Sequence, residues 1–128
     1  MEAAAWLSYD GCMRTILVVD DHPSFRATAR ALLAAEGFDV VGEAEDGASA
    51  LAEVARLRPQ IVLLDIQLPD IDGFEVAARL RDNGSPPQLV LTSSREEADF
   101  GSLVAESGAR GFIAKDALSG AAIAALVE

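Results

Sequence analysis

Short apolar runs recur along this chain at broadly regular intervals, and this pattern limits the fold more than any other feature. The runs occupy residues 16–19, 40–41, 61–64, 89–91 and 111–114. Each run has the length of a β-strand, and the segments between them carry apolar residues at helical spacing, such as Leu51, Val54 and Ala55. Strands that alternate with helices predict a parallel sheet, because each helix provides the crossover that a parallel pair requires.

The first, third and fourth runs are too apolar for strands with one face in water. Helices are therefore expected on both faces of the sheet, which gives an α/β fold of the doubly wound (βα)5 type. Three glycines lie where helices would end in a left-handed residue: Gly37, Gly84 and Gly108. Three polar residues are candidate caps at or near helix starts: Ser24, Asp72 and Ser119. Residues 13–128 are predicted to form the domain and residues 1–12 an N-terminal tail, with the last helix at 119–127.

The charge and the cysteine content exclude several classes of function. Ten basic residues against 21 acidic ones give a net charge of −11, which would repel phosphate backbones and anionic lipid headgroups. We therefore expect this domain to bind neither nucleic acid nor membranes directly. The single cysteine, Cys12, has no partner for a disulfide within the chain, and the apolar runs are too short to span a bilayer. These features predict a soluble cytoplasmic protein.

Polar and charged residues follow four of the five apolar runs. In chain order they are Asp20 and Asp21, then Asp65, then Thr92 and Ser93, and finally Lys115. Functional groups of an open parallel sheet gather at the carboxyl ends of its strands, so we expect these side chains to lie together. Lys115 is the single lysine among ten basic residues. A lysine offers a compact charge that suits a phosphoryl oxygen or a carboxylate.

Three converging aspartates would repel one another and raise their pKa values unless a cation neutralised them. Their hard oxygen donors suit Mg²⁺ better than zinc, which prefers histidine and cysteine. An alternative is that Asp20 and Asp21 form only a polar turn that supplies charge to a helix N-terminus. His22 is interpreted as a loop residue beside the acidic pair, because one histidine makes no metal-binding cluster.

Four motifs occur in the same order as in one known family: ILVVDD, LLDIQLPDIDG, LTSS and GFIAKD. From about Arg14 to its last residue, the chain resembles the receiver domain of bacterial response regulators in two-component signalling. The resemblance implies a flavodoxin-like sheet with strand order 2-1-3-4-5. It also implies a partner, a sensor histidine kinase or a phosphotransfer protein, that donates a phosphoryl group.

The resemblance further implies a role for the residues that follow the first, third and fifth apolar runs. Asp65 corresponds to the phosphoacceptor. Asp21, Asp65 and the backbone carbonyl of Gln67 correspond to the ligands of Mg²⁺, and Asp20 would hold the ion through water. Lys115 corresponds to the ammonium that pairs with the phosphoryl group.

Two residues correspond to the family's conformational switch. Thr92 resembles the hydroxyl that bonds the phosphoryl oxygen, but Ser93 is a competing assignment. Strand length favours Thr92, whereas the usual interval counted back from Lys115 ends at Ser93. Phe112 occupies the place of the aromatic residue that follows this hydroxyl; the alternative is that it packs as an ordinary core residue.

The resemblance implies that the domain is not an enzyme for an external substrate, since it would catalyse only the modification of its own Asp65 and the later dephosphorylation. A phosphatase of the haloacid dehalogenase type is a weaker alternative, because neither acidic site has a second aspartate two residues after the nucleophile. A further alternative is a pseudo-receiver, an interaction module that acts by dimerisation without phosphorylation. We expect any homodimer to form through the last two helices.

Overall fold

A parallel sheet lies at the centre of the structure, a computed structural model that describes residues 13–128. Within these residues the sheet has five strands in the order β2-β1-β3-β4-β5. The strands are β1 (Arg14–Val19), β2 (Phe38–Ala44), β3 (Ile61–Asp65), β4 (Gln88–Ser93) and β5 (Gly111–Ala114). Both the parallel pairing and the predicted order are confirmed. The predicted tail, residues 1–12, lies outside the described residues.

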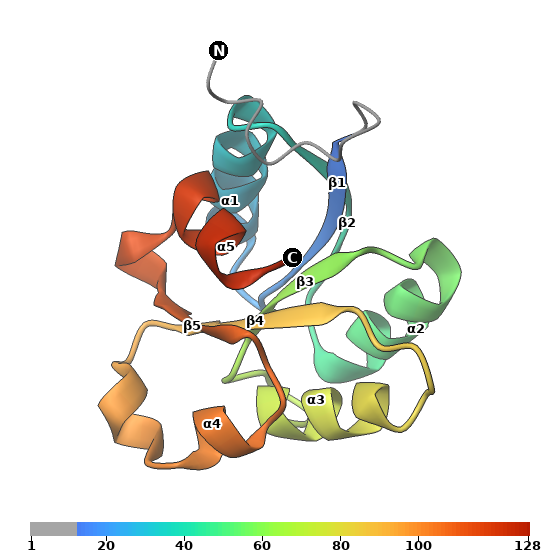
Figure 1. Ribbon diagram of the computed structural model, residues 1–128, viewed down its shortest axis with the longest axis vertical. Coiled ribbons are helices and arrows are strands. Elements are labelled where there is room, and N and C mark those ends of the chain that lie inside the picture. The colour runs from blue at the N-terminus through green and yellow to red at the C-terminus, as the bar shows by residue number, and fades with distance from the viewer. Residues whose placement is uncertain (1–12) are drawn as a thin grey trace.

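Helices cover both faces of the sheet, as the apolar runs predicted (Figure 1). One face carries α1 (Pro23–Ala35) and α5 (Gly120–Leu126), and the other carries α2 (Gly47–Leu57), α3 (Gly73–Arg81) and α4 (Leu103–Glu106). The described residues also contain two short 3-10 helices, η2 (Glu97–Phe100) before α4 and η3 (Lys115–Ala117) after β5. The doubly wound (βα)5 architecture is therefore confirmed. Within residues 13–128, none of these helices has the length and apolar character that a membrane crossing requires.

Strand β3 is buried along its whole length because it lies between two apolar layers. Ile61 and Leu63 pack with α1 and α5, whereas Val62 and Leu64 pack with α2, α3 and α4. Alternate residues of a strand point to opposite faces, so a strand covered on both sides must be apolar at every position. This requirement explains the uninterrupted run of residues 61–64, which ends at the carboxylate of Asp65.

The helix boundaries confirm two of the three predicted caps. The side chain of Asp72 accepts a hydrogen bond from the backbone N–H of Glu75, and Ser119 caps α5 in the same way. Ser24 lies inside α1 rather than at its cap, because Pro23 begins this helix with His22 at the cap position. The three predicted helix-ending glycines, at 37, 84 and 108, all have positive φ angles.

Replacing the buried Leu63 by alanine is expected to lower the free energy of unfolding by about 2–5 kcal/mol, because the central strand would lose packing and gain a cavity. The matched control is Leu103→Ala on α4, where the leucine is 49% exposed and the change should stay within about 0.5 kcal/mol. Urea denaturation followed by circular dichroism measures both. Equal losses would contradict the central position of β3.

Candidate functional site

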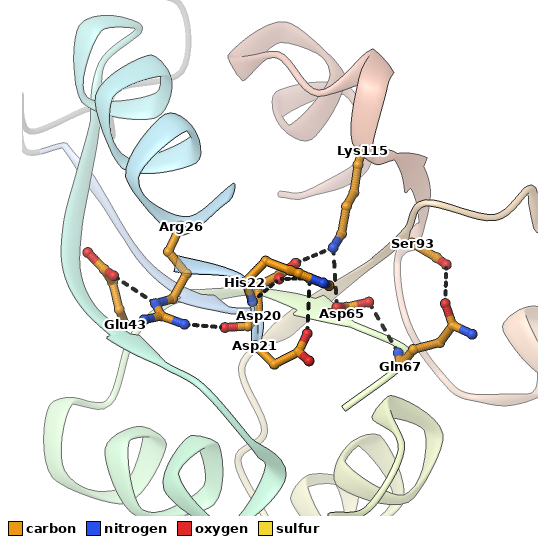
Figure 2. Close-up of polar contacts among 9 residues, drawn as sticks. All are labelled: Asp20, Asp21, His22, Arg26, Glu43, Asp65, Gln67, Ser93 and Lys115. Atoms are coloured by element: carbon orange, nitrogen blue, oxygen red, sulfur yellow. Dashed lines mark hydrogen bonds and ion pairs between the residues drawn. The ribbon is translucent and has the colours of Figure 1, made fainter. Parts of the chain in front are cut away.

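The carboxyl ends of β1, β3 and β5 bring three of the predicted site residues together (Figure 2). Asp20 directly follows β1, Asp65 ends β3, and Lys115 directly follows β5. β1 and β3 are neighbours whose register pairs Val19 with Leu64, so the next residue of each strand emerges at the same edge. The strand order reverses at this point, which is where open α/β sheets hold their ligands.

Lys115 joins two buried carboxylates. Its Nζ lies 2.6 Å from Asp20 Oδ2 and 3.3 Å from Asp65 Oδ2. The same ammonium lies 4.8 Å from the centre of the Phe25 ring. Burial alone would lower the pKa of Lys115, but the close contact with the Asp20 carboxylate and the charge of Asp65 raise it above its ordinary value. The lysine is therefore charged, and it supplies the positive charge next to the carboxylates of Asp20 and Asp65.

Asp65 is held in an environment that disfavours its charged form. Burial is the largest cause and the neighbouring Asp20 carboxylate the next, and together they raise the pKa of Asp65 to about 6. The backbone N–H of Gln67, 3.1 Å from Asp65 Oδ1, and the ammonium of Lys115 act in the opposite direction. A further cation near Asp65 would therefore be favoured, because it would stabilise the ionised carboxylate.

Asp21 and His22 extend the site towards solvent. The Nδ1 atom of His22 lies 3.2 Å from Asp20 Oδ1 and 3.1 Å from Asp21 Oδ1. The backbone N–H of His22 also donates to Asp20 Oδ1 at 2.8 Å. His22 is thus a loop residue beside the acidic pair, as predicted, but its ring contacts both carboxylates, which the sequence did not indicate.

The donor set of this site fits Mg²⁺. Four residues each offer one ligand atom, all within 4.8 Å of one another: Asp20, Asp21, His22 and Asp65. Among the described residues, the buried oxygens Asp20 Oδ2 and Asp21 Oδ1 are approached as ion pairs, the first by Lys115 Nζ at 2.6 Å and the second by His22 Nδ1 at 3.1 Å, and neither has a further hydrogen-bond partner. Three carboxylates face a single ammonium, so the site has negative charge to spare. Hard oxygen donors with excess negative charge are what Mg²⁺ prefers.

The two candidate hydroxyls have different surroundings at the end of β4. Thr92 is fully buried, and its Oγ1 donates to the carbonyl of Ile113 at 2.6 Å. Ser93 Oγ accepts from the backbone N–H of Arg95 at 3.0 Å and lies 3.4 Å from the Oε1 atom of Gln67. Figure 2 shows the hydroxyl of Ser93 pointing towards the side chain of Gln67, and the backbone N–H of Gln67 contacting Asp65. The hydroxyl of Thr92 is thus engaged by β5, whereas that of Ser93 contacts the loop after Asp65.

Comparison with known proteins identifies the family. The family model of the response regulator receiver domain matches residues 16–127. The chain belongs to this family. The match gives no support to the pseudo-receiver alternative. It assigns the chain to the receiver family rather than to the phosphatases of the haloacid dehalogenase type. Receiver domains bind Mg²⁺ through an acidic pocket of this kind, take a phosphoryl group from histidine kinases and are, in transcriptional regulators, generally not enzymes.

Several relatives of this receiver domain are known. The chain is 40% identical over 102 residues to the "Probable transcriptional regulatory protein NarL" of Mycobacterium tuberculosis, with 79% of this chain and 47% of that protein covered. It is 31% identical over 99 residues to the DNA-binding transcriptional activator EvgA of Escherichia coli K12, with 77% and 48% covered. The chain thus spans about half the length of the curated relatives it matches.

A solved structure agrees with the fold of this receiver domain. The signal receiver domain of NarL from Mycobacterium tuberculosis superimposes with a TM-score of 0.76 at 38% sequence identity, covering 83% of this chain and 86% of that one. The strand order and this agreement confirm the flavodoxin-like prediction.

Phe112 of this receiver lies in a row of three aromatic rings. Its ring centroid is 6.2 Å from that of Phe100 in η2, which is 5.9 Å from that of Phe74 in α3. All three rings are partly buried and pack against the core on the α2–α4 face. Phe112 therefore connects β5 to α3 by aromatic packing, a contact compatible with either of its predicted roles.

Arg26 is a residue of the site region that the sequence did not reveal. Its side chain is only 16% exposed, and its guanidinium donates to the carbonyl oxygen of Asp20 at 2.6 Å and to Glu43 at 3.0 Å. Arg30 also contacts Glu43, at 2.6 Å, and these arginines, Arg30 first, lower the pKa of that carboxyl. Arg26 thus connects the turn after β1 to β2. Arg26 and Glu43 are 17 residues apart, so no local sequence pattern predicts their contact.

Replacing Lys115 by methionine is expected to lower the free energy of unfolding by about 2–4 kcal/mol in magnesium-free buffer, because the buried carboxylates of Asp20 and Asp65 would lose their counter-charge. Saturating Mg²⁺ should stabilise this variant more than the wild type. The matched control is Arg79→Met, which breaks the exposed pair with Glu75 and should cost less than about 1 kcal/mol. Denaturation midpoints with and without Mg²⁺ measure the effect; equal losses in both variants would count against the buried pairing.

Proposed function

We propose that this receiver domain takes a phosphoryl group onto Asp65 from a phosphohistidine of a partner protein. The observation that carries the proposal is the position of the Asp65 carboxylate. It is buried at the end of the central strand, next to Asp20, and 3.3 Å from the chain's single lysine. A carboxylate nucleophile beside an ammonium and further oxygen donors is the arrangement that phosphoryl transfer requires.

Asp21, Asp65 and the backbone carbonyl of Gln67 would hold Mg²⁺, and Asp20 would hold it through water. One buried oxygen on Asp20 and one on Asp21 support this assignment, because beyond their ion pairs with Lys115 and His22 neither accepts a hydrogen bond from the described residues. When bound, the ion supplies positive charge that neutralises the oxygens of the transferring phosphoryl group. Lys115, whose Nζ lies 3.3 Å from Asp65 Oδ2, supplies a second positive charge.

In the transfer, an oxygen of Asp65 forms a bond to phosphorus as the phosphorus–nitrogen bond of the phosphohistidine breaks. The electron pair of the broken bond stays on the imidazole of the donor. Lys115, which already contacts Asp65, can pair with a phosphoryl oxygen without a large movement. The product is an acyl phosphate, and attack by water at phosphorus later releases inorganic phosphate and restores the carboxylate. The only reaction that the domain assists is therefore its own modification and reset.

Of the two candidate hydroxyls, the contacts favour Ser93 as the one that bonds the phosphoryl oxygen. Ser93 already contacts Gln67, in the loop that follows the acceptor. Thr92 would have to break a 2.6 Å hydrogen bond to Ile113 inside the sheet. A movement of Ser93 towards the phosphorylated Asp65 would shift the end of β4. Phe112 on the adjacent strand would then report the shift through packing alone, since it has no hydroxyl.

The partner of this chain would be a sensor histidine kinase or a phosphotransfer protein, and the cytoplasm is the compartment we propose for their encounter. A homodimer through α4 and α5 would use Leu103, the large apolar residue that α4 exposes. The curated relatives are named as transcriptional regulators, so we propose that phosphorylation of this domain controls transcription. The net charge of −11 makes direct DNA contact by this domain unfavourable.

Asp65→Asn is expected to abolish phosphoryl uptake, because an amide cannot form the acyl phosphate. Wild type incubated with Mg²⁺ and acetyl phosphate should gain one phosphoryl group in an intact-mass spectrum, and the variant none. Asp72→Asn is the matched control: it makes the same change in an exposed cap of α3 and should leave uptake unchanged. Uptake by the Asp65 variant would show that another residue is the acceptor.

Ser93→Ala should still accept the phosphoryl group but lose the conformational response, seen as missing chemical-shift changes in β4 and β5 after phosphorylation. Thr92→Val should retain the response and instead lose about 1–2 kcal/mol of stability, because the buried carbonyl of Ile113 loses its donor. NMR spectra with and without phosphodonor, together with urea denaturation, measure both properties. The opposite pattern would assign the switch hydroxyl to Thr92.

A further inference from the structure

The loop between β3 and α3 is fastened to a helix outside the proposed phosphoryl site. Asp70, in this loop, accepts a hydrogen bond from the backbone N–H of Gly47 at 2.8 Å through Oδ1 and from that of Ala48 at 2.9 Å through Oδ2. Both N–H groups belong to the first turn of α2, where the helix itself provides no acceptors. The Asp70 carboxylate thus joins the loop to α2, across 23 residues of sequence for Gly47 and 22 for Ala48.

The α2 N-terminus would not need Asp70 for an ordinary cap. Asp46, directly before the helix, already accepts from the backbone N–H of Ser49 at 2.8 Å, and the Ser49 hydroxyl returns a contact to Asp46. Asp70 accepts hydrogen bonds from the N–H groups of Gly47 and Ala48, which this local cap does not bind. The helix is already capped, so the bonds of Asp70 serve to connect the loop to it.

Side-chain packing reinforces the connection at both ends of the loop. A Cβ atom on Gly47 would collide with Ile71, so the loop lies directly against the first residue of α2. At the other end, a Cβ atom on Gly73 would lie 2.7 Å from the carbonyl oxygen of Asp65. The backbone N–H of Gly73 also donates to Ile66 at 2.7 Å. The loop is therefore held between β3 and α2 with little space to shift.

Asp70 remains ionised wherever the domain is folded under ordinary conditions. The N–H groups of Gly47, first, and Ala48 lower the pKa of Asp70 to about 2. Its bonds to the helix are charge-assisted, which makes them stronger than bonds between neutral groups. The helix dipole at the α2 N-terminus favours the same charge.

We propose that Asp70 is a positioning residue, which anchors the loop of residues 66–72 to α2 and thereby holds the backbone of Gln67 in place beside Asp65. This inference rests on the proposed function, in which the Gln67 carbonyl binds Mg²⁺. Gln67 precedes Asp70 by three residues, and its N–H donates to Asp65 Oδ1 at 3.1 Å. A loop released from α2 would misplace both the donor N–H and the ligand carbonyl of Gln67, without any loss of a group that touches the phosphoryl oxygens.

Three matched substitutions test the anchor: Asp70→Asn, Asp46→Asn and Asp72→Asn. All three remove one negative charge. Asp46→Asn alters the α2 cap but leaves the loop attached, and Asp72→Asn alters the same loop at the cap of α3. Mg²⁺ affinity is measured by titration calorimetry, and the initial rate of phosphoryl uptake from acetyl phosphate by intact mass, at a temperature below the lowest melting midpoint of the set.

Asp70→Asn is expected to weaken Mg²⁺ binding and to slow uptake by about tenfold, in the range typical of groups that orient metal ligands. The two control variants should stay within about twofold of wild type. Wild-type values in Asp70→Asn, with or without a lower melting midpoint, would reduce Asp70 to a structural role and overturn the proposal. A loss in Asp46→Asn as large as that in Asp70→Asn would also overturn it, because the end of α2 rather than the connection would then be responsible.

Wild-type protein provides a second measurement that needs no variant. Coupling between two sites is reciprocal, so if the anchor strengthens Mg²⁺ binding, then Mg²⁺ must strengthen the anchor. Hydrogen exchange at the amides of Gly47 and Ala48 should therefore slow by about tenfold on addition of Mg²⁺. Unchanged exchange in protein that binds Mg²⁺ and accepts phosphate would contradict the anchor alone, whereas wild-type protein that does neither would overturn the proposed function itself.

Discussion

The ion pairs of Lys115 with Asp20 and Asp65 are the interactions on which the site depends. Both carboxylates are buried, and burial together with the charge of Asp20 disfavours the ionisation of Asp65. The backbone pairing of β1 with β3 nevertheless forces them to the same edge of the sheet. One ammonium, delivered by the end of β5, offsets part of this cost, and the remaining negative charge makes the site attractive to a divalent cation. The repulsion between the buried carboxylates and the capacity of the site to bind Mg²⁺ thus have the same cause, which is the excess of negative charge at this edge of the sheet.

Polar contacts outside the site hold the loops that carry its residues. Arg26 binds the carbonyl of Asp20 and so fixes the turn after β1 against β2. Asp70 binds the first turn of α2 and so fixes the loop after β3. Gly73 closes the same loop against the carbonyl of Asp65. The rigid sheet therefore positions the side chains, while these contacts position the backbone between its strands, where loops would otherwise be mobile.

Much of the fold and part of the site could be predicted from particular residues. The apolar run before Asp65 has no polar position because both faces of β3 are covered, so the pattern indicated a parallel strand with helices on both sides, whereas the strand order came from the family resemblance. The aspartates and Lys115 were recognisable because residues that end parallel strands share one edge of the sheet. The choice between Thr92 and Ser93 could not be made in this way. Successive residues of a strand face opposite sides, and which of them faces the site depends on how β4 pairs with its neighbours.

The sequence by itself determined the (βα)5 architecture and the acidic character of the site, because both depend on local patterns: apolar runs of strand length and the residues that end them. Only the tertiary structure decided which groups hold the loops in place. The bonds from Gly47 and Ala48 to Asp70 join segments more than 20 residues apart, and Arg26 reaches Glu43 across 17 residues. No periodicity relates such residues, because their proximity arises from the packing of α1 against β2 and of the loop before α3 against α2.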